Sequence, residues 1–374
     1  MATSRLRVLL VGGHHHAEIR GRTVAIHGLA RALRDGGHEV TLLHAARSEH
    51  RVSLDGIRMV YIGTTRKSIY PLLIALRRLD RYHVIHANDE SGAWFGLRSR
   101  LKRLPLVVQF QPPRVKPEGF LRSGWRWRYI GVAARNAPIL VCPSDWLGRE
   151  LARRYHLPDD RVRVVPYGVA DHWFEVGSRD PVDRPPGSRV VLVNMKGVDV
   201  ALRAFAAAVP SGEARLELFG TEKRAGETME LAGRLGIGER VVVHGFVPNE
   251  QLPARLLGAD LLLHPTRSES FGQVLAEAAA LGIPVISSRV NAVPEVVADG
   301  ETGLLCPSGD VDAYAAALAS LLSNGDLRRR MGKANRARAD SRWRWERVVA
   351  RLHSEAYAPL LETAQRSAAD LNSS

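Results

Sequence analysis

The feature that most constrains this chain is the regular alternation of short apolar runs with helical patterns in its first half. One helical pattern, "TVAIHGLARALRDGG", ends at Gly36 and Gly37, as helices often do. The apolar runs of strand length are "LRVLLVGG" (Leu6–Gly13), "HEVTLLH", "IRMVYIG", "HVIHAN", "PLVVQF", "PILVCPS" and "VRVVPYG". Strands that alternate with helices form parallel sheets. The pattern therefore predicts an α/β fold with a doubly wound parallel sheet.

A polar segment rich in proline and glycine, "GSRDPVDRPPGSR" (Gly177–Arg189), interrupts this alternation. Such a composition is typical of a linker. The alternation then resumes through "VVLVN", "ARLELFG", "RVVVHGF", "ADLLLHP", "IPVIS" and "TGLLC". We therefore expect two Rossmann-like domains, residues 1–180 and 181–345, followed by a C-terminal helix and tail over residues 346–374. Two such domains facing each other would form a cleft, the usual place for a small-molecule site.

The excess positive charge of the chain lies entirely in its first half. Residues 1–180 contain 30 Lys and Arg against 16 Asp and Glu, a net charge of +14, whereas the other residues contain 23 of each. This asymmetry predicts an anionic partner for the first domain: an acidic lipid surface, an anionic acceptor or nucleic acid. An arginine-rich composition without such a partner is the alternative.

Two widely separated cysteines, Cys142 and Cys306, provide no disulfide framework, which indicates a reducing compartment. The apolar run near the N-terminus is too short for a signal peptide, and no apolar stretch is long enough to span a bilayer. We therefore expect a cytoplasmic protein, with peripheral contact at the inner membrane surface as an open alternative.

The stretch "HPTRSESFGQVLAEAAALGIPVI" (His264–Ile286) places two glutamates around one predicted helix. It follows an apolar run and ends in another, which indicates one strand–turn–helix–strand segment of an open α/β sheet. Ligands of such sheets bind outside the carboxyl ends of the strands, where Glu269 lies. The first helical turn holds Phe271 and Gly272, and its free N–H groups and the helix dipole suit a pyrophosphate.

Glu277 lies one turn beyond Gln273 on the same helix face and is a poor choice for burial among alanines. Phosphate repels a carboxylate, so Glu277 is better suited to accept hydrogen bonds from hydroxyl groups. The vicinal diol of a ribose could supply two. Glu269 could do the same for a sugar. Two glutamates eight residues apart are common, however, so their spacing alone is weak evidence for a site.

The full pattern, "P-T-x-x-E-x-F-G-x-x-x-x-E-A-x-x-x-G-x-P-V", closely resembles the signature of the retaining glycosyltransferases of family 4. The resemblance implies the GT-B fold, in which two Rossmann-like domains face a central cleft and the second holds most of the nucleotide-sugar. Other similar stretches extend over nearly the whole chain: Leu29–Leu43, Val164–Phe174, Val293–Asp310 and "RWRWERV". The last resembles the start of the helix that, in this family, crosses back to the first domain.

The resemblance also implies a role for each matching residue. Glu277 would bind the ribose of the donor and Glu269 hydroxyls of the transferred sugar. Lys196, in "MKGVD", would face the diphosphate and stabilise the leaving group. Gly21 matches a glycine of a loop that lies close to the donor phosphate. The residues expected to contact sugar and phosphate around the helix start are Phe271, Gly272, Gln273 and Val274. No metal ion or other cofactor is expected.

Three departures from the family pattern bear on donor and acceptor. The Gly-Arg pair that family members carry after the first strand of the second domain is missing from "VVLVNMKGVD", which leaves Asn194 as the nearest polar substitute. Arg20 and Arg22 flank Gly21 and are candidates to replace that arginine, and Arg20-Gly21 stands where the family has Gly-Gly. Gln111 stands where the family has a histidine, and it could still donate a hydrogen bond to the sugar.

Two other motifs leave alternatives open. The three histidines at positions 14–16 are metal-ligand types, but consecutive residues point in different directions, so a polar loop with one histidine near the acceptor is favoured over a metal site. The segment Gly119–Asn136 predicts either an amphipathic helix at an acidic membrane surface or a helix that packs Trp125 and Tyr129 on the domain. Its aromatic residues could stack on nucleic acid, but no recognisable nucleic-acid module accompanies them.

The sequence thus predicts a retaining glycosyltransferase that moves a sugar from a nucleoside-diphosphate sugar to an acceptor. A small molecule, which could be an anionic metabolite or a natural-product intermediate, is favoured as acceptor over an anionic lipid or another lipid-linked acceptor, and nucleic acid is not expected. Catalytic roles are predicted for Glu269, Lys196 and Gln111. Two other functions stay open: a GT-B-type nucleotide-sugar epimerase or hydrolase, and a catalytically silent donor-binding scaffold, which the missing arginine suggests.

Overall fold

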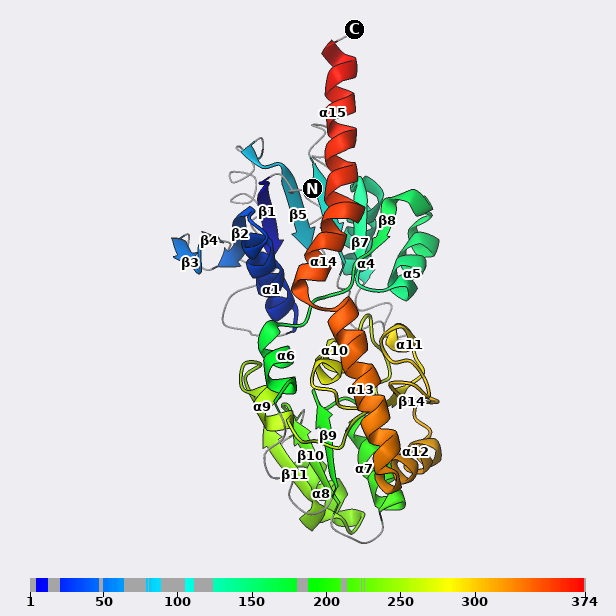
Figure 1. Cartoon of the computed structure of the whole chain (residues 1–374). Coiled ribbons are helices and arrows are strands. Elements are labelled where there is room, and N and C mark those ends of the chain that lie inside the picture. Colours follow the sequence, from blue (N-terminus) through cyan, green and yellow to red (C-terminus); the bar gives the residue numbers. More distant parts are fainter. Residues whose placement is uncertain are drawn as a thin grey trace. The chain divides into compact units, whose positions relative to one another are not determined.

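The computed structural model (Figure 1) describes residues 5–12, 21–46, 50–63, 79, 81–88, 105–110, 124–179, 188–209, 214–222, 224 and 226–372. The chain forms two compact units. Unit 1 comprises Met1–Gly168 together with Trp345–Ser374, and unit 2 comprises Val169–Arg344. Each unit is built around its own, mainly parallel β-sheet, which confirms the predicted fold class.

The described strands of unit 1 form an eight-stranded sheet in the order β3-β4-β2-β1-β5-β6-β7-β8. They are β1 (Arg7–Gly12), β2 (Glu39–Ala46), β3 (His50–Leu54), β4 (Ile57–Gly63), β5 (Val84–Asn88), β6 (Leu106–Gln109), β7 (Ile139–Cys142) and β8 (Val162–Val164). All neighbouring pairs are parallel except β3 and β4, which form a hairpin at one edge. The central strands β5 and β6 are buried at every residue, as expected where helices cover both faces of a parallel sheet.

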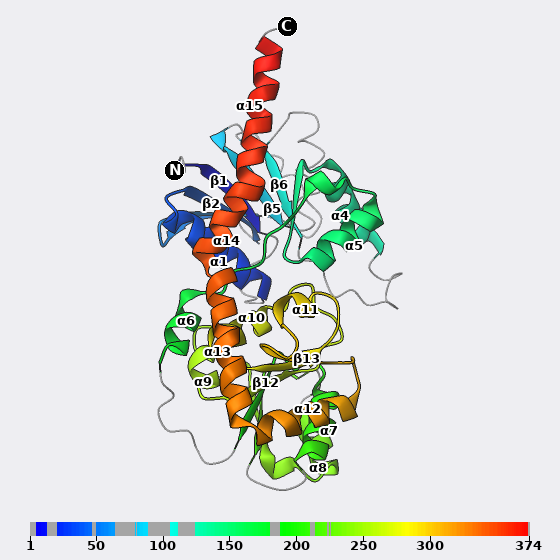
Figure 2. The ribbon, with the colours of Figure 1, turned by 45° about the vertical axis from the view of Figure 1, so that its right-hand side comes forward.

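Helices cover both faces of the unit 1 sheet. The described helices are α1 (Gly21–Asp35), α4 (Gly124–Asn136), α5 (Asp145–Tyr155), α14 (Trp345–Leu352) and α15 (Ala358–Asn372), with a 3₁₀ turn at Asp159–Arg161 and a π turn at His353–Tyr357. Side chains of α1 and α14 pack on one face around Val8, and those of α4 and α5 pack on the other around Ile85. The helix α14 lies beside α1 in both ribbon views (Figures 1 and 2).

The C-terminal segment is part of the core of unit 1, which confirms that the last helix returns to the first domain. Trp345 packs so closely on α1 that a Cβ at Gly28 would collide with its indole ring. In the π turn, Tyr357 Oη lies 2.9 Å from His86 Nδ1, and His86 Nε2 lies 2.8 Å from Gln109 Oε1. Burial lowers the pKa of His86 to about 4, so this chain of hydrogen bonds is neutral at physiological pH.

The described strands of unit 2 form a six-stranded parallel sheet in the order β11-β10-β9-β12-β13-β14. They are β9 (Arg189–Val193), β10 (Arg215–Phe219), β11 (Val241–Gly245), β12 (Leu261–His264), β13 (Val285–Ser288) and β14 (Gly303–Cys306). The chain winds outward from β9 to β11, then crosses to β12 and winds the other way. The carboxyl ends of β9 and β12 therefore flank the topological switch point, where doubly wound sheets bind their ligands.

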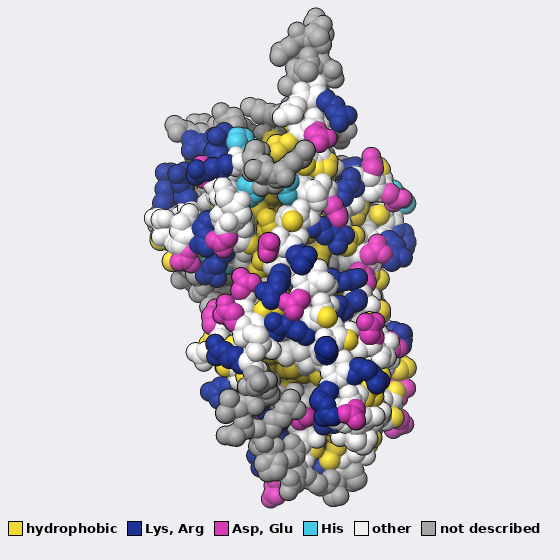
Figure 3. Space-filling model, viewed as in Figure 1, with side chains coloured by type: hydrophobic (Ala, Val, Ile, Leu, Met, Phe, Trp, Pro, Cys, Tyr) yellow, Lys and Arg dark blue, Asp and Glu magenta, His cyan; other side chains and the backbone are white. Residues whose placement is uncertain are grey.

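Helix α13 binds several elements of unit 2 together through its arginines. The described helices of this unit are α6 (Asp171–Gly177), α7 (Val198–Ala208), α8 (Glu227–Arg234), α9 (Leu252–Leu256), α10 (Gln273–Ala280), α11 (Val293–Val296), α12 (Val311–Ser323) and α13 (Gly325–Arg342), with a 3₁₀ turn at Gly238–Arg240. Lys and Arg side chains follow α13 on the face shown in Figure 3. Arg336 donates to the carbonyl groups of Ala280 (2.6 Å) and Phe174 (3.1 Å), and so joins α13 to α10 and α6.

Helix α6 belongs to unit 2, although it precedes the linker. Trp173 and Phe174 are almost fully buried, and the Trp173 indole N–H donates to Asn249 Oδ1 (3.3 Å). The N-terminal segment of unit 1 therefore ends at Gly168, ahead of the domain boundary expected at residue 180. Among the residues that the structure describes, no helix has the length and apolar character needed to cross a bilayer.

Candidate active site

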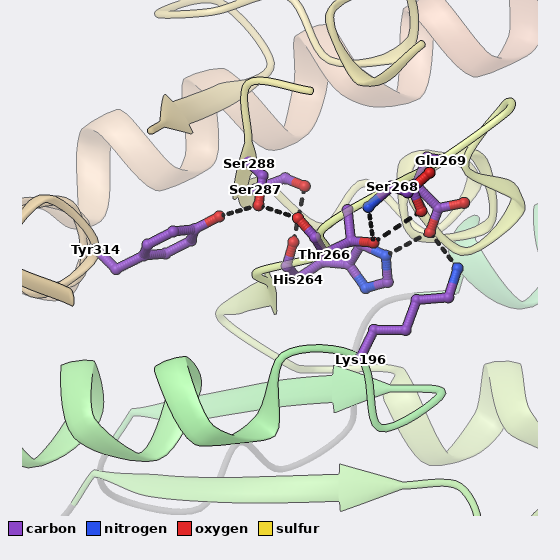
Figure 4. Close-up of polar contacts among 8 residues, drawn as sticks. All are labelled: Lys196, His264, Thr266, Ser268, Glu269, Ser287, Ser288 and Tyr314. Carbon is purple, nitrogen blue, oxygen red and sulfur yellow. Dashed lines mark hydrogen bonds and ion pairs between the residues drawn. The ribbon is translucent and has the colours of Figure 1, made fainter. Parts of the chain in front are cut away.

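The candidate site lies at the carboxyl edge of the unit 2 sheet, on the turns that follow β9 and β12. Lys196 lies in the turn between β9 and α7, and Glu269 lies in the turn between β12 and α10. The two side chains meet although they are 73 residues apart in the chain, because β9 and β12 are neighbours at the switch point. Figure 4 shows Lys196 reaching from its turn to the carboxylate of Glu269.

The turn that carries Lys196 is short and left-handed. The φ angle is 67° at Asn194 and 66° at Gly197. A Cβ at Gly197 would collide with the carbonyl group of Pro265, so only glycine lets this turn approach the turn after β12 so closely. The loop that lacks the expected Gly-Arg pair is therefore a tight connection that places Lys196 directly against the next turn. The side chain of Asn194 is exposed at its start.

Two side chains donate hydrogen bonds to the same carboxylate oxygen of Glu269. Its Oε1 accepts hydrogen bonds from Lys196 Nζ and from His264 Nε2, the latter 3.1 Å long. The side chain of Glu269 is 10% exposed, and that of His264 is fully buried. Burial alone would raise the pKa of Glu269, but the hydrogen bond from His264 and the charge of Lys196 outweigh it and lower the pKa to about 2. Glu269 is therefore ionised at neutral pH and already compensated.

Buried hydroxyl groups fix the backbone that carries this cluster. Ser287 Oγ, on the neighbouring strand β13, donates to the carbonyl group of His264 (2.8 Å). Ser288 Oγ donates to the carbonyl group of Thr266 and lies 2.7 Å from Tyr314 Oη. Because Ser288 has a single hydroxyl proton, Tyr314 must be the donor in the second contact. These bonds attach the turn after β12 to the sheet and preorganise it (Figure 4).

The start of α10 lies where the sequence predicts an anion site. Gly272, with φ 101°, precedes the helix, and no side chain caps it. Backbone N–H groups in the first turn of a helix point beyond its end, where the helix dipole adds partial positive charge. Those of Gln273 and Val274 lie in this first turn. Phe271 is buried and packs edge-on against Trp343, with ring centroids 6.2 Å apart. Only its backbone is therefore suited to contact a ligand.

Glu277 is in the opposite situation to Glu269. Its side chain is buried in α10, and its Oε1 accepts hydrogen bonds from Asn249 Nδ2 (3.3 Å) and Gln273 Nε2 (3.5 Å). Both donors are neutral and both bonds are long. Burial raises the pKa of Glu277 to about 7, and the two bonds only partly offset this. Glu277 therefore lacks the strong donors that a buried carboxylate requires.

Asn249 is oriented by residues that lie behind it. Its Oδ1 accepts the indole N–H of Trp173 (3.3 Å), and this contact turns its amino group toward Glu277. The ring of His172 also contacts the carbonyl group of Asn249, with Nε2 3.4 Å away. The side chain that directs Glu277 is therefore held from α6, a helix far from α10 in sequence.

The structure gathers most of the predicted site residues on unit 2. Lys196 meets Glu269 and Gln273 meets Glu277, while Phe271, Gly272, Val274 and Asn194 lie in the turns described above. Gly21 is the first residue of α1 in unit 1. Several other predicted residues lie outside the described part of the chain: Gln111, Arg20 and the histidines at positions 14–16. The side chains of Arg22, Trp125 and Tyr129 also lie outside it.

Three residues that orient the site were not predicted from the sequence: His264, Asn249 and Trp173. His264 ends β12 and Asn249 follows β11, so the rule that placed Glu269 at the carboxyl edge of the sheet could also have identified them. No comparable signal marks Trp173, because its contact with Asn249 depends on α6 packing in unit 2.

Two family models match the chain. The model for Glycosyltransferase Family 4 matches residues 19–172, and the model for Glycosyl transferases group 1 matches residues 190–338. The second match contains Lys196, Glu269 and Glu277.

Curated relatives are similar over most of the chain. An MMP alpha-(1->4)-mannosyltransferase of Mycolicibacterium hassiacum is 30% identical over 74% of this chain and 71% of its own length. A GDP-mannose-dependent alpha-(1-6)-phosphatidylinositol monomannoside mannosyltransferase of Mycolicibacterium smegmatis is 35% identical over 84% of this chain and 89% of its own length. For a D-inositol 3-phosphate glycosyltransferase of Corynebacterium diphtheriae, 32% identical, the match spans only 58% of that relative.

Solved structures share the fold at lower identity. A sucrose-phosphate synthase from Thermosynechococcus elongatus gives a TM-score of 0.74 at 21% identity, covering 99% of this chain and 100% of that one. Anabaena Alr3699/HepE in complex with UDP and glucose gives a TM-score of 0.74 at 17% identity, covering 94% and 99%. The family models and curated relatives, together with this architecture, show that the chain is a GT-B glycosyltransferase and belongs to glycosyltransferase family 4.

Proposed function

We propose that this glycosyltransferase takes its sugar from a nucleoside-diphosphate sugar bound mainly by unit 2, and transfers it with retention of configuration to an anionic acceptor. The main support for a donor site is the pair of glutamates in α10 and in the turn before it. Glu269 lies beside Lys196, and Glu277 is buried with only weak donors. One positive group beside a helix start, and two carboxylates able to accept from hydroxyl groups, match a diphosphate flanked by two sugars.

The donor diphosphate is proposed to bind between the start of α10 and Lys196. The backbone N–H groups of the first helical turn would donate to phosphate oxygens. Lys196 would stabilise the negative charge that develops on the leaving phosphate when the glycosidic bond breaks. Because both contacts exist before the reaction, little reorganisation is required at the moment of bond cleavage.

The two carboxylates are proposed to bind hydroxyl groups on either side of the diphosphate. Glu277 accepts from the ribose diol, which supplies the donors that its buried oxygen atoms lack in the free protein. Glu269 accepts from a hydroxyl of the transferred sugar. Attack by the acceptor would occur from the face of the leaving group, with the leaving phosphate helping to take the acceptor proton, as expected for a retaining enzyme of this family.

The acceptor is proposed to be a small anionic molecule. The first 180 residues carry all of the excess positive charge of the chain. The names of three relatives include an anionic compound: D-inositol 3-phosphate, phosphatidylinositol monomannoside and L-malate. One of these is a lipid and two are small molecules, so acceptor assays should compare a phosphorylated polyol and a dicarboxylate with vesicles of an anionic phospholipid.

A donor-binding protein without transferase activity is the second candidate. The short turn after β9 favours it, because Lys196 is the only cationic residue from Asn194 to Gly197. In that case the protein would bind a nucleotide but release no sugar with any acceptor. A nucleotide-sugar hydrolase or epimerase would instead consume the donor when no acceptor is present.

A thermal-shift titration with UDP, GDP, ADP and dTDP tests the donor site. We expect one nucleotide to raise the melting temperature of the native protein and to have much less effect on Glu277→Gln. Glu250→Gln is the matched control, because Glu250 is exposed in the same loop as Asn249. Absence of stabilisation by all four nucleotides would contradict the proposed donor site.

A further inference from the structure

Among the side chains that the structure describes, the histidine at the end of β12 makes one polar contact, which is to Glu269. His264 is fully buried, and its Nε2 lies 3.1 Å from Glu269 Oε1. An ionised carboxylate can only accept hydrogen bonds, so the imidazole proton must be on Nε2. In a neutral ring, Nδ1 is then an acceptor.

The other ring nitrogen of His264 is unsatisfied. Nδ1 is buried and has no hydrogen-bond partner among the residues that the structure describes. Buried polar atoms are nearly always paired, so a histidine with an unpaired ring nitrogen at this position calls for an explanation. The hydrogen bond from Nε2 to Glu269 therefore gives a chemical reason for a histidine at this position.

Lys196 cannot be a permanent partner of Glu269 if it serves the donor diphosphate. Its side chain is 27% exposed, compared with 10% for Glu269, so it is free to turn toward a ligand. Glu269 would then be a largely buried carboxylate that has lost its cation, which is unfavourable without another donor. His264 cannot turn away in the same manner, because its ring is fully buried and Ser287 holds its carbonyl group.

We propose that His264 is a positioning residue, a fixed hydrogen-bond donor that keeps Glu269 charged and correctly aimed while Lys196 moves to the donor diphosphate. This inference rests on the proposed donor site. It assigns separate roles to the two groups that share Glu269 Oε1: Lys196 is the exchangeable partner, and His264 is the permanent one.

The imidazole tautomer of His264 tests the inference without any assay of activity. The full chain would be labelled with ¹⁵N-histidine, and the ring signals would be assigned by their loss in His264→Gln. We expect Nε2 to carry a proton that is donated to Glu269, both in the free protein and after addition of the nucleoside diphosphate that stabilises it. A proton on Nδ1 alone, or exchange between tautomers when the nucleotide binds, would overturn the proposal.

Two substitutions of similar polarity separate a positioning role from a structural one. The amide of His264→Gln can reach the place of Nε2, whereas the shorter amide of His264→Asn reaches only the place of Nδ1. We expect His264→Asn to lower kcat with the donor sugar about 10- to 100-fold and His264→Gln to retain most of it, with the Kd of the nucleoside diphosphate unchanged in both. Equal losses in the two variants, or a matching loss of nucleotide affinity, would overturn the proposal.

The failure of this inference can be distinguished from failure of the proposed function. If no nucleoside diphosphate binds the native protein, the donor site is wrong, whatever the tautomer of His264. If the nucleotide binds and Glu277→Gln abolishes binding, but the proton lies on Nδ1, only the role of His264 is wrong. The tautomer is measured on the native protein, and loss of the ring signals in either His264→Gln or His264→Asn suffices to assign them, so the measurement remains decisive if one of the two variants fails to fold.

Discussion

Glu269 and Glu277 lie on the same edge of the unit 2 sheet, yet their surroundings act on them in opposite ways. Glu269 accepts from a lysine and a histidine, and the pKa of its carboxyl group is lowered to about 2. Glu277 accepts only long bonds from two amides, and burial raises its pKa to about 7. A carboxylate compensated within the protein is ready to orient a hydroxyl group. A carboxylate without compensation gains most when a ligand supplies the missing donors.

Substitution of Lys196, the cation beside Glu269, should have the largest effect on the reaction rate. We expect Lys196→Gln to lower kcat about 100- to 1000-fold, because the variant loses a charged donor at the leaving phosphate. Initial rates with the native donor and acceptor measure this. Lys333→Gln is the control, since Lys333 is exposed on α13, and its rate should equal that of the native protein. Loss of less than tenfold in Lys196→Gln would show that another group stabilises the leaving phosphate.

Glu277→Gln should weaken donor binding by a smaller factor. The amide can still accept one hydrogen bond, but it cannot accept two charge-assisted bonds from a ribose diol. We expect the Kd of the nucleoside diphosphate to rise about 10- to 100-fold, as isothermal titration calorimetry would measure. An unchanged Kd would mean that Glu277 does not contact the nucleotide.

The two glutamates should also affect stability with opposite signs. A folded-state pKa of about 7 for Glu277 means that its stabilising effect is fully present below the unfolded value near 4.5 and is lost as pH rises through 7. Glu277→Gln should therefore be more stable than the native protein at pH 8, by up to about 3 kcal/mol, and nearly equal to it at pH 5. Thermal unfolding at the two pH values measures this difference.

Glu269→Gln provides the contrast to that result. The lowered pKa of Glu269 means that its contribution is present above about pH 4.5 and is lost only as pH falls toward 2. The variant should thus be less stable than the native protein at both pH 8 and pH 5, by about 1–3 kcal/mol. A stabilising effect of Glu269→Gln at pH 8 would contradict the compensation of Glu269 by its two donors.

The smallest effect on nucleotide affinity is expected when Asn249, whose amide orients Glu277, is substituted. Asn249→Ala removes one long, neutral hydrogen bond, so nucleotide affinity should fall only about 2- to 10-fold. Trp173→Phe, which removes the indole donor behind Asn249 but keeps an aromatic ring, should change affinity by no more than Asn249→Ala. A larger effect of Trp173→Phe would indicate that α6 itself has moved.

The strand and helix pattern predicted both sheets, because alternation and burial on two faces are encoded locally in short apolar runs. The motif around Glu269 and Glu277 also predicted that Glu269 lies at the carboxyl edge of the sheet, since strand ends at a switch point lie together by topology. The electrostatic difference between the two glutamates was not predictable in this way. It depends on Lys196 and Asn249, which reach the glutamates from the turns after β9 and β11, and on His264, which ends the strand before the turn of Glu269.

The placement of α6 in unit 2 was likewise not predictable from the local sequence. The polar segment Gly177–Arg189 reads as a linker from composition, and it follows α6 directly. The assignment of α6 to unit 2 depends on the burial of Trp173 and on the contact of Phe174 with Arg336, which is a long-range interaction. Composition carries no information on such a partner.

Proton release on donor binding tests the contrast between the two glutamates most directly. Calorimetric titrations with the nucleotide-sugar at pH 7, in two buffers of different ionisation enthalpy, measure the protons released. If Glu277 is partly protonated in the free protein and ionised when the ribose diol binds, about half a proton should be released per site, and none from Glu277→Gln. Release of no proton by the native protein, or equal release by the variant, would contradict the proposal that the ligand supplies what Glu277 lacks.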